Sequence, residues 1–275
     1  MRKSFAKHDR PLLIGVVRER TARDAIAKIM SCKTHGATGI DLHLSCMDES
    51  ARTIDQLRGV VNACPLPILA LNYNHSYDWK DTQAPEEERI NLLMNAIHAG
   101  AAAIDLQGYS FHQPSKHNFC GTDDFSFTKG NPKEIVTDQA VIDKQRKLID
   151  EVHDLGAEVL ISTHPGVFLD CQQVLDLARF LEQRQPDMIK IVAPCQNHLQ
   201  LAEAIKTQIV LEQAIKTPVH YHVSGKAGRL SRIINPLLGG HLIFCSDGFT
   251  PNANFEQSDL ATTKIALDAL NNILL

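Results

Sequence analysis

Short apolar runs alternate along the chain with amphipathic segments whose apolar positions recur at helical spacing. Most of the short runs are almost continuously apolar, which is typical of parallel strands covered on both faces. Eight strands are predicted, over residues 12–17, 39–44, 67–73, 102–107, 158–164, 188–193, 218–224 and 241–246.

Each predicted strand is followed by a predicted helix. The helices span residues 21–35, 50–64, 84–99, 138–155, 171–183, 198–215, 228–238 and 255–274. Thr21 is a suitable N-cap residue, and Gly36, Gly100 and Gly156 are suitable stops, each followed by alanine and a new strand. This repeated unit, over 275 residues, predicts one α/β domain spanning residues 1–275, a (β/α)₈ TIM barrel, which typically needs about 250 residues. The chain has no GxGxxG motif after the first strand and no Walker loop, which disfavours a doubly wound nucleotide-binding fold.

The segment 108–137 after the fourth strand is too long for an ordinary βα connection. It is rich in Gly, Pro, Asn, Asp, Ser and aromatic residues. A βα loop lies at the C-terminal face of a barrel, where active sites occur. We therefore expect a lid-like loop or an interface arm, and a plain surface insertion remains an alternative.

Composition places the chain among cytoplasmic enzymes. Its net charge is −4 and its pI about 6.3, which gives no electrostatic reason to bind nucleic acid or an anionic membrane. No run of about 18 apolar residues occurs, and the basic residues at the start precede no apolar signal segment. The seven cysteines are widely spaced without a CxxC pair, so we expect reduced thiols.

Lys190 is an ionisable residue within the apolar run Met-Ile-Lys-Ile-Val-Ala. Alternate residues of a barrel strand point inward, so this lysine faces either the barrel or the helix layer. Burying an ammonium is costly unless it is paired or gives up its proton. We expect a lysine that attacks a carbonyl carbon to form an imine, with a side chain reaching water from the strand end as the alternative.

Further polar residues are expected at the mouth of the barrel. His164 ends the fifth strand, where a catalytic proton carrier would lie, although a structural histidine is the alternative. Other inward candidates are Asp41, His43 and Ser45, Asp105 and Gln107, and His220, His222 and Ser224. These side chains could bind a divalent metal, but Lys190 would repel it, so we expect neither a metal nor a cofactor.

The segment after the seventh strand reads Gly-Lys-Ala-Gly-Arg-Leu-Ser-Arg over residues 225–232. Glycines at a strand–helix turn expose backbone N–H groups, and Arg229 and Arg232 add positive charge. This segment is a candidate site for a carboxylate or phosphate, with Arg229 as a solvated helix residue the alternative.

Three segments, Met188-Ile-Lys-Ile-Val, Ile161-Ser-Thr-His164 and Ser224 to Arg232, together resemble the type I 3-dehydroquinate dehydratase family. Phe244 and the late Ser-Asp-Leu sequence at 258–260 fit the same pattern. The resemblance implies a metal-free barrel that dehydrates 3-dehydroquinate to 3-dehydroshikimate, in the shikimate pathway of aromatic amino acid biosynthesis, through an imine. By position it implies that Lys190 is the Schiff-base lysine, His164 the general acid/base, Arg232 the carboxylate-binding residue and Phe244 a pocket residue.

The sequence departs from the family pattern around this core. Asp41 and His43 replace Glu-x-Arg, Tyr73 replaces an arginine with no Glu-Gly-Gly after it, and Pro165 replaces an aspartate. His222 and Ser224 stand where two methionines are usual, and Thr250 to Asn254 replace a Ser-Ala-Pro-Gly-Gln loop. Expected substrate contacts are Arg232, Asp41, His43, Tyr73, His222, Ser224, Phe244, Thr250 and Asn254.

The predicted partner is therefore a small carbonyl compound bearing a carboxylate, with a homodimer possible. Two alternatives stay open. One is a Schiff-base lyase, aldolase or isomerase acting on another polyol keto acid or carbonyl compound. The other is a barrel that binds a ligand without catalysis.

Overall fold

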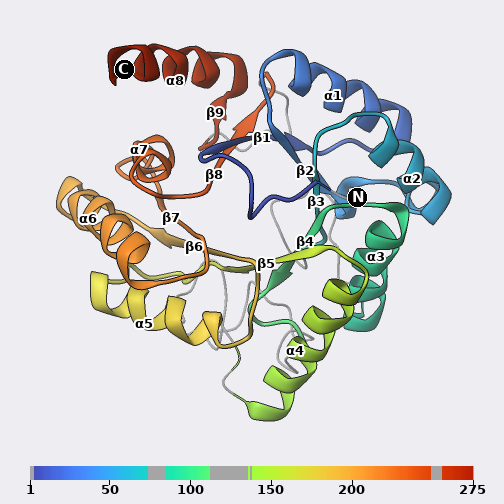
Figure 1. Ribbon diagram of the computed structural model, residues 1–275, viewed down its shortest axis with the longest axis horizontal. Coiled ribbons are helices and arrows are strands. Elements are labelled where there is room, and N and C mark those ends of the chain that lie inside the picture. Colours follow the sequence, from blue (N-terminus) through green and yellow to red (C-terminus); the bar gives the residue numbers. More distant parts are fainter. Residues whose placement is uncertain (1–2, 74–84, 112–135, 137, 249–255, 275) are drawn as a thin grey trace.

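The computed structural model describes residues 3–73, 85–111, 136, 138–248 and 256–274. Within these residues the chain forms a single curled parallel sheet surrounded by helices (Figure 1). The strands are β1 (Leu12–Val17), β2 (Gly39–His43), β3 (Ile68–Leu71), β4 (Ala103–Gln107), β5 (Glu158–Thr163), β6 (Met188–Pro194), β7 (Val219–Ser224), β8 (Leu242–Ser246) and β9 (Ser258–Asp259). The eight predicted strands are thus confirmed, with ends shifted by at most two residues, and β9 is an addition.

The strand order is β7-β6-β5-β4-β3-β2-β1-β8-β9, with every ladder parallel. In the described residues, β7 and β8 are not joined by ladder hydrogen bonds. Their side chains are in contact, since the ring centres of His220 on β7 and Phe244 on β8 lie 5.5 Å apart. The TIM-barrel-like fold predicted from the alternation of strands and helices is confirmed.

The α-helices are α1 (Ala22–Thr34), α2 (Ile54–Asn62), α3 (Glu86–Ala99), α4 (Gln139–Asp154), α5 (Cys171–Glu182), α6 (His198–Ala214), α7 (Ser231–Leu237) and α8 (Leu260–Leu274). Two short 3₁₀ helices, Leu44–Cys46 and Glu49–Ala51, precede α2. Thr21 accepts a hydrogen bond from the Asp24 amide as the predicted N-cap. Gly36, Gly100 and Gly156 adopt positive φ angles at the predicted helix ends, a conformation that favours glycine.

Three helices begin three or more residues later than the sequence pattern indicated. The side chain of Thr53 caps α2 by accepting the Gln56 amide, so the predicted start at residue 50 was wrong. The start of α8 is delayed because Ser258 and Asp259 pair with β8 before the helix begins. The start of α7 is delayed to Ser231 by a turn through Gly228, where a Cβ atom would lie 2.6 Å from the Ser224 carbonyl oxygen.

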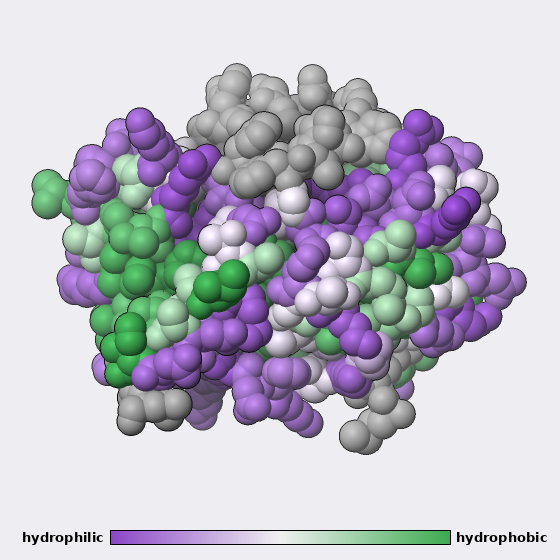
Figure 2. Space-filling view, turned by 90° about the horizontal axis from the view of Figure 1, so that it is seen from above, coloured by the Kyte–Doolittle hydropathy of each residue, from purple (hydrophilic) through white to green (hydrophobic). Residues whose placement is uncertain are grey.

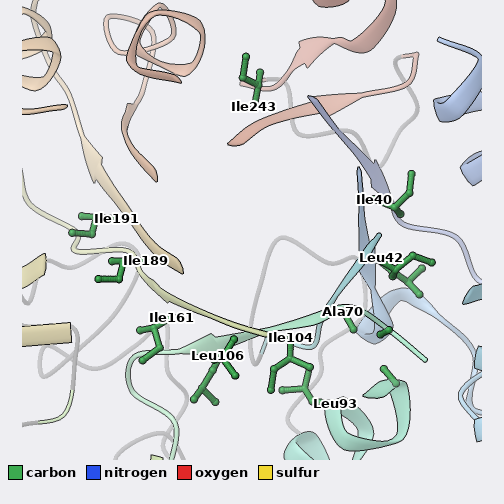
Figure 3. Packing of buried hydrophobic residues seen from close by; sticks show 14 of the residues in the cluster. Ile40, Leu42, Ala70, Leu93, Ile104, Leu106, Ile161, Ile189, Ile191 and Ile243 are labelled. Atoms are coloured by element: carbon green, nitrogen blue, oxygen red, sulfur yellow. The ribbon is translucent and has the colours of Figure 1, made fainter. Parts of the chain in front are cut away.

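Side chains alternate between two separate apolar layers. Ile161, Ile189, Ile191 and other residues of the same parity point outward and pack against the helices (Figure 3). Residues of the opposite parity fill the barrel, including Leu12, Leu160 and Met188. The N-terminal segment covers the bottom of this interior, with Phe5 fully buried. Lys190 is two residues from Met188 on the same strand and therefore points into the barrel with it, as an imine-forming lysine must.

On the face shown in Figure 2, apolar residues gather on the side of α8. Ile265 and Ile273 on that helix are 70% and 77% exposed. None of the helices in the described residues is long and apolar enough to cross a membrane.

Of the predicted lid-like loop 108–137, only residues 108–111 and 136 are described. The remainder of that prediction lies outside the described residues. The two described ends are held by the side chains of Gln145 on α4 and of Arg184, which follows α5. Gln145 donates to the Gly108 and Ser110 carbonyl oxygens, and Arg184 donates to the Val136 carbonyl oxygen at 2.8 Å.

Candidate active site

Lys190 lies at the centre of a pocket at the C-terminal end of the strands. Its Nζ atom donates to the Tyr73 hydroxyl oxygen at 2.9 Å and lies 3.4 Å from Asp105 Oδ2. The same atom is 4.9 Å from the centre of the Phe244 ring. The side chain is buried in the inner layer and paired with a carboxylate, so the alternative of a solvated lysine at a strand end is wrong.

A compact polar network connects this lysine on β6 to Ser162 on β5, Asp105 on β4 and Tyr73 just after β3. The Tyr73 hydroxyl lies 2.8 Å from Asp105 Oδ2 and 2.9 Å from Ser162 Oγ. Ser162 in turn donates to Asp105 Oδ1 at 2.5 Å. Ser162 stands beside Lys190 in the β5–β6 register, so the strand pairing itself brings these groups together. Burial raises the pKa of Asp105, although the positive charge of Lys190 and the hydrogen bonds from Ser162 and Tyr73 act in the opposite direction.

His164 follows β5 directly and lines the same pocket. Its ring meets the Tyr73 ring edge-on, with 5.5 Å between the centres. Burial, helped by the positive charges of Lys190 and Arg232, holds the pKa of His164 well below its usual range. The imidazole is therefore neutral near pH 7, the form in which it can accept a proton.

His220 and His222 on β7 hydrogen-bond to one another, with 2.9 Å between His220 Nε2 and His222 Nδ1. The two histidines are therefore hydrogen-bond partners of one another. Burial, with the charge of Lys190 or Arg232 as a further cause, holds both pKa values well below 6.5. His222 lines the pocket, and its Nε2 atom is buried without a partner in the described residues. It can therefore hydrogen-bond to a bound ligand.

Arg232 reaches the pocket from the first turns of α7. Its Nη2 atom donates to Glu256 Oε2 at 2.8 Å, while Glu256 Oε1 accepts the Gly225 amide. Arg232 Nε is buried and has no hydrogen-bond partner in the described residues. The guanidinium is thus oriented by one carboxylate and keeps a buried donor for an anion.

The opposite wall comes from β1 and β2. His43 Nε2 lies 3.2 Å from Asp41 Oδ2, and Arg18 Nε donates to His43 Nδ1 at 3.4 Å. Because its Nδ1 accepts from Arg18, the imidazole carries its proton on Nε2, directed at Asp41. Asp41 and His43 are the two residues that stand in place of Glu-x-Arg in the resembled pattern, and Arg18 joins them from the end of β1.

Most predicted site residues meet in this pocket. Its described lining consists of Arg18, Asp41, His43, Leu71, Tyr73, His164, Lys190, Val192, His222, Arg232, Phe244 and Gln257. Ser224 is not in this lining and instead lies 3.5 Å from the Ala193 carbonyl oxygen. Thr250 and Asn254 lie outside the described residues.

Sequence reasoning missed several residues of the site. Arg18 had a usable signal, because it is the first charged residue beyond an apolar strand. Asp105 was recognised as inward-facing but was not assigned to the site, and Ser162 was not singled out. Gln257 had no signal, since the segment around it was assigned to a helix. No group of three or more His, Cys, Asp or Glu side chains in the described ranges is arranged to hold a metal ion.

Tyr73 is positioned by a buried ion pair beneath it. Arg89 is 1% exposed and donates to the carbonyl oxygen of Asn72, the residue before Tyr73. It also donates to Glu86 at 2.7 Å and 2.9 Å. Burial acts to raise the pKa of Glu86, but the Arg89 guanidinium outweighs it and holds that pKa below 4.5.

Replacing Glu86 by alanine is expected to destabilise the fold. The substitution leaves the Arg89 guanidinium buried without its carboxylate, which costs about 3 kcal/mol in comparable buried pairs. Urea unfolding monitored by circular dichroism measures the change. Glu87→Ala is the matched control, since Glu87 is exposed on the same helix turn. Equal unfolding free energies for the two variants would contradict the assigned role of the pair.

Comparison with known proteins adds a family assignment to this geometry. The model of the family "Type I 3-dehydroquinase" matches residues 132–274. A 3-dehydroquinate dehydratase of Desulfotalea psychrophila is 26% identical over 166 residues, which is 59% of each chain. Among solved structures, the 3-dehydroquinate dehydratase of Geobacillus kaustophilus has a TM-score of 0.75 at 12% identity, covering 96% of this chain and 92% of that one. The enzyme of Enterococcus faecalis has a TM-score of 0.71 at 16% identity, covering 95% of both chains. The matched segment includes His164, Lys190 and Arg232, and the chain belongs to the type I 3-dehydroquinase family.

Proposed function

We propose that the protein is a Schiff-base lyase that dehydrates 3-dehydroquinate to 3-dehydroshikimate. The observation that carries this proposal is a buried lysine, Lys190, sharing one pocket with the neutral imidazole of His164 and the guanidinium of Arg232. Family membership supports the same reaction, although the curated relative is matched over only 59% of its own length.

The chemistry follows from the roles these groups can take. Lys190 attacks the ketone carbon, and loss of water gives a protonated imine that withdraws electrons from the neighbouring C–H bond. The neutral His164 takes that proton, and the resulting enamine expels the β-hydroxyl group. His164 then returns the proton to the leaving hydroxyl. Arg232 holds the carboxylate of the substrate.

Trapping of the imine tests this proposal. The protein is incubated with 3-dehydroquinate and borohydride, and its intact mass is measured alongside absorbance of 3-dehydroshikimate without borohydride. We expect a mass increase of one reduced adduct and formation of product. A protein that shows neither adduct nor product contradicts the proposed reaction.

A second candidate function is the same imine chemistry on another polyol keto acid or carbonyl compound. It is favoured by the Asp41–His43–Arg18 chain and by Tyr73, which replace groups the family uses. Sites that hydrogen-bond polar substrate groups discriminate strongly against analogues that lack them. Adducts with other hydroxyketones in the trapping assay, together with no adduct from 3-dehydroquinate, would favour this function.

A further inference from the structure

The hydroxyl group of Tyr73 stands between the amine of Lys190 and the carboxylate of Asp105. The oxygen of Tyr73 is 2.9 Å from Lys190 Nζ and 2.8 Å from Asp105 Oδ2. All three side chains are buried, and the Tyr73 and Lys190 positions are 117 residues apart in the chain.

The donor inventory fixes the direction of these hydrogen bonds. A lysine ammonium only donates and a carboxylate only accepts. The Tyr73 oxygen therefore accepts from Lys190. We assign its own proton to Asp105 Oδ2, which at 2.8 Å is the shorter and the charged of its two acceptor contacts, the other being Ser162 Oγ at 2.9 Å. Ser162 donates to the other carboxylate oxygen and holds that carboxylate in place. The result is an unbroken hydrogen-bonded path from the Lys190 N–H through the Tyr73 O–H to the Asp105 carboxylate. A proton can move along it when each group passes its own proton to the next.

We propose that Tyr73, with Asp105 behind it, carries the protons of imine formation and imine hydrolysis, so that His164 serves the C–H step. This inference rests on the function proposed above and names a further catalytic residue for it. Tyr73 lines the pocket, so its hydroxyl lies beside any oxygen bonded to the carbon that Lys190 attacks. Asp105 acts through Tyr73 and is a positioning and proton-storing residue.

The steps balance without another reactant. The Lys190 ammonium passes a proton to Tyr73 while the Tyr73 proton passes to Asp105, which leaves a neutral amine. The amine forms the C–N bond, the carbonyl π electrons move to oxygen, and a proton moves from nitrogen to that oxygen. The proton stored on Asp105 then returns through Tyr73 to the hydroxyl, the C–O bond breaks, and water leaves as the nitrogen lone pair forms the iminium.

A further observation fits this role. Burial is the largest cause raising the pKa of both Tyr73 and Asp105, which favours a neutral phenol and a carboxyl able to hold a proton in transit.

Rapid-quench trapping with 3-dehydroquinate and borohydride tests the relay in the full chain. In Tyr73→Phe we expect the adduct to accumulate about 100-fold more slowly, the usual contribution of general acid–base catalysis. The final adduct amount should match that of the unmodified protein, because Lys190 and the pocket remain. Asp105→Asn keeps a hydrogen-bond acceptor but stores no proton, and it should slow adduct formation in the same way.

Tyr221→Phe is the matched control. Tyr221 is a buried β7 tyrosine facing the helix layer, and its hydroxyl has no hydrogen-bond partner in the described residues. Tyr221→Phe should accumulate the reduced adduct at the rate of the unmodified protein. His164→Gln should also accumulate the adduct at that rate, but it should form no product. Unchanged trapping in Tyr73→Phe would overturn the relay alone. Absence of any adduct in the unmodified protein would overturn the imine function, and the relay with it.

Discussion

Replacement of Lys190 by methionine is expected to abolish turnover of 3-dehydroquinate. Methionine has nearly the length of lysine and suits the apolar rings of Tyr73 and Phe244, which lie 5.3 Å and 4.9 Å from Nζ. It cannot form an imine, so the adjacent C–H bond is no longer activated. Loss of a covalent nucleophile lowers kcat by about 10⁴-fold or more in comparable enzymes. Steady-state absorbance and intact mass after borohydride treatment measure both consequences.

The control for this variant is its stability. Removing an ammonium from the interior leaves Asp105 with its hydrogen bonds from Tyr73 and Ser162, so the fold should persist. The unfolding transition of Lys190→Met should therefore remain cooperative. A folded Lys190→Met protein that still forms product at a rate within tenfold of the unmodified protein would rule out an essential imine at this position.

Mild acid is expected to destabilise the protein strongly. Burial is the largest cause lowering the pKa of four histidines, namely His164, His220, His222 and His241. For His241 the pKa falls from 6.5 to about 4. In the unfolded chain the same groups titrate near pH 6.5.

The direction of the effect follows from proton counts. Below pH 6.5 the unfolded chain binds protons that the folded protein does not, so stability falls as the pH falls. Each histidine that is protonated in the unfolded chain but neutral in the folded protein contributes a slope of about 1.4 kcal/mol per pH unit, so four contribute about 6 kcal/mol per pH unit. For His241 the slope ends near pH 4. Asp105 acts in the opposite sense, since its raised pKa lets the folded protein take up a proton first.

Urea unfolding at pH 7.0 and pH 5.5 measures this dependence. His241→Gln is a useful variant because the glutamine amide can still donate to the Phe5 carbonyl oxygen, 2.8 Å from His241 Nε2. His241→Gln should reduce the slope of unfolding free energy against pH by about a quarter. Equal stability at the two pH values would show that the buried histidines gain protons in the folded state.

The sequence alone determined the architecture and narrowed the side-chain direction of the principal strand residues to one of two faces. Period-two alternation assigns Lys190 to one of two faces, and a strand end places His164 at the mouth of a barrel. These features depend on local patterns, because the side-chain direction along a strand and the stop at a glycine are fixed by neighbouring residues. The parallel alternation of strand and helix sufficed for the fold.

Only the tertiary structure decided which polar groups meet. Tyr73 lies 117 residues from Lys190, and Glu256 lies 24 residues beyond Arg232, yet both pairs are within hydrogen-bond distance. The late start of α8 likewise depends on pairing of Ser258 and Asp259 with β8. Such contacts arise from the curvature of the sheet and from burial, which forces each polar group to find a partner wherever the chain brings one. No local pattern in the sequence records that outcome.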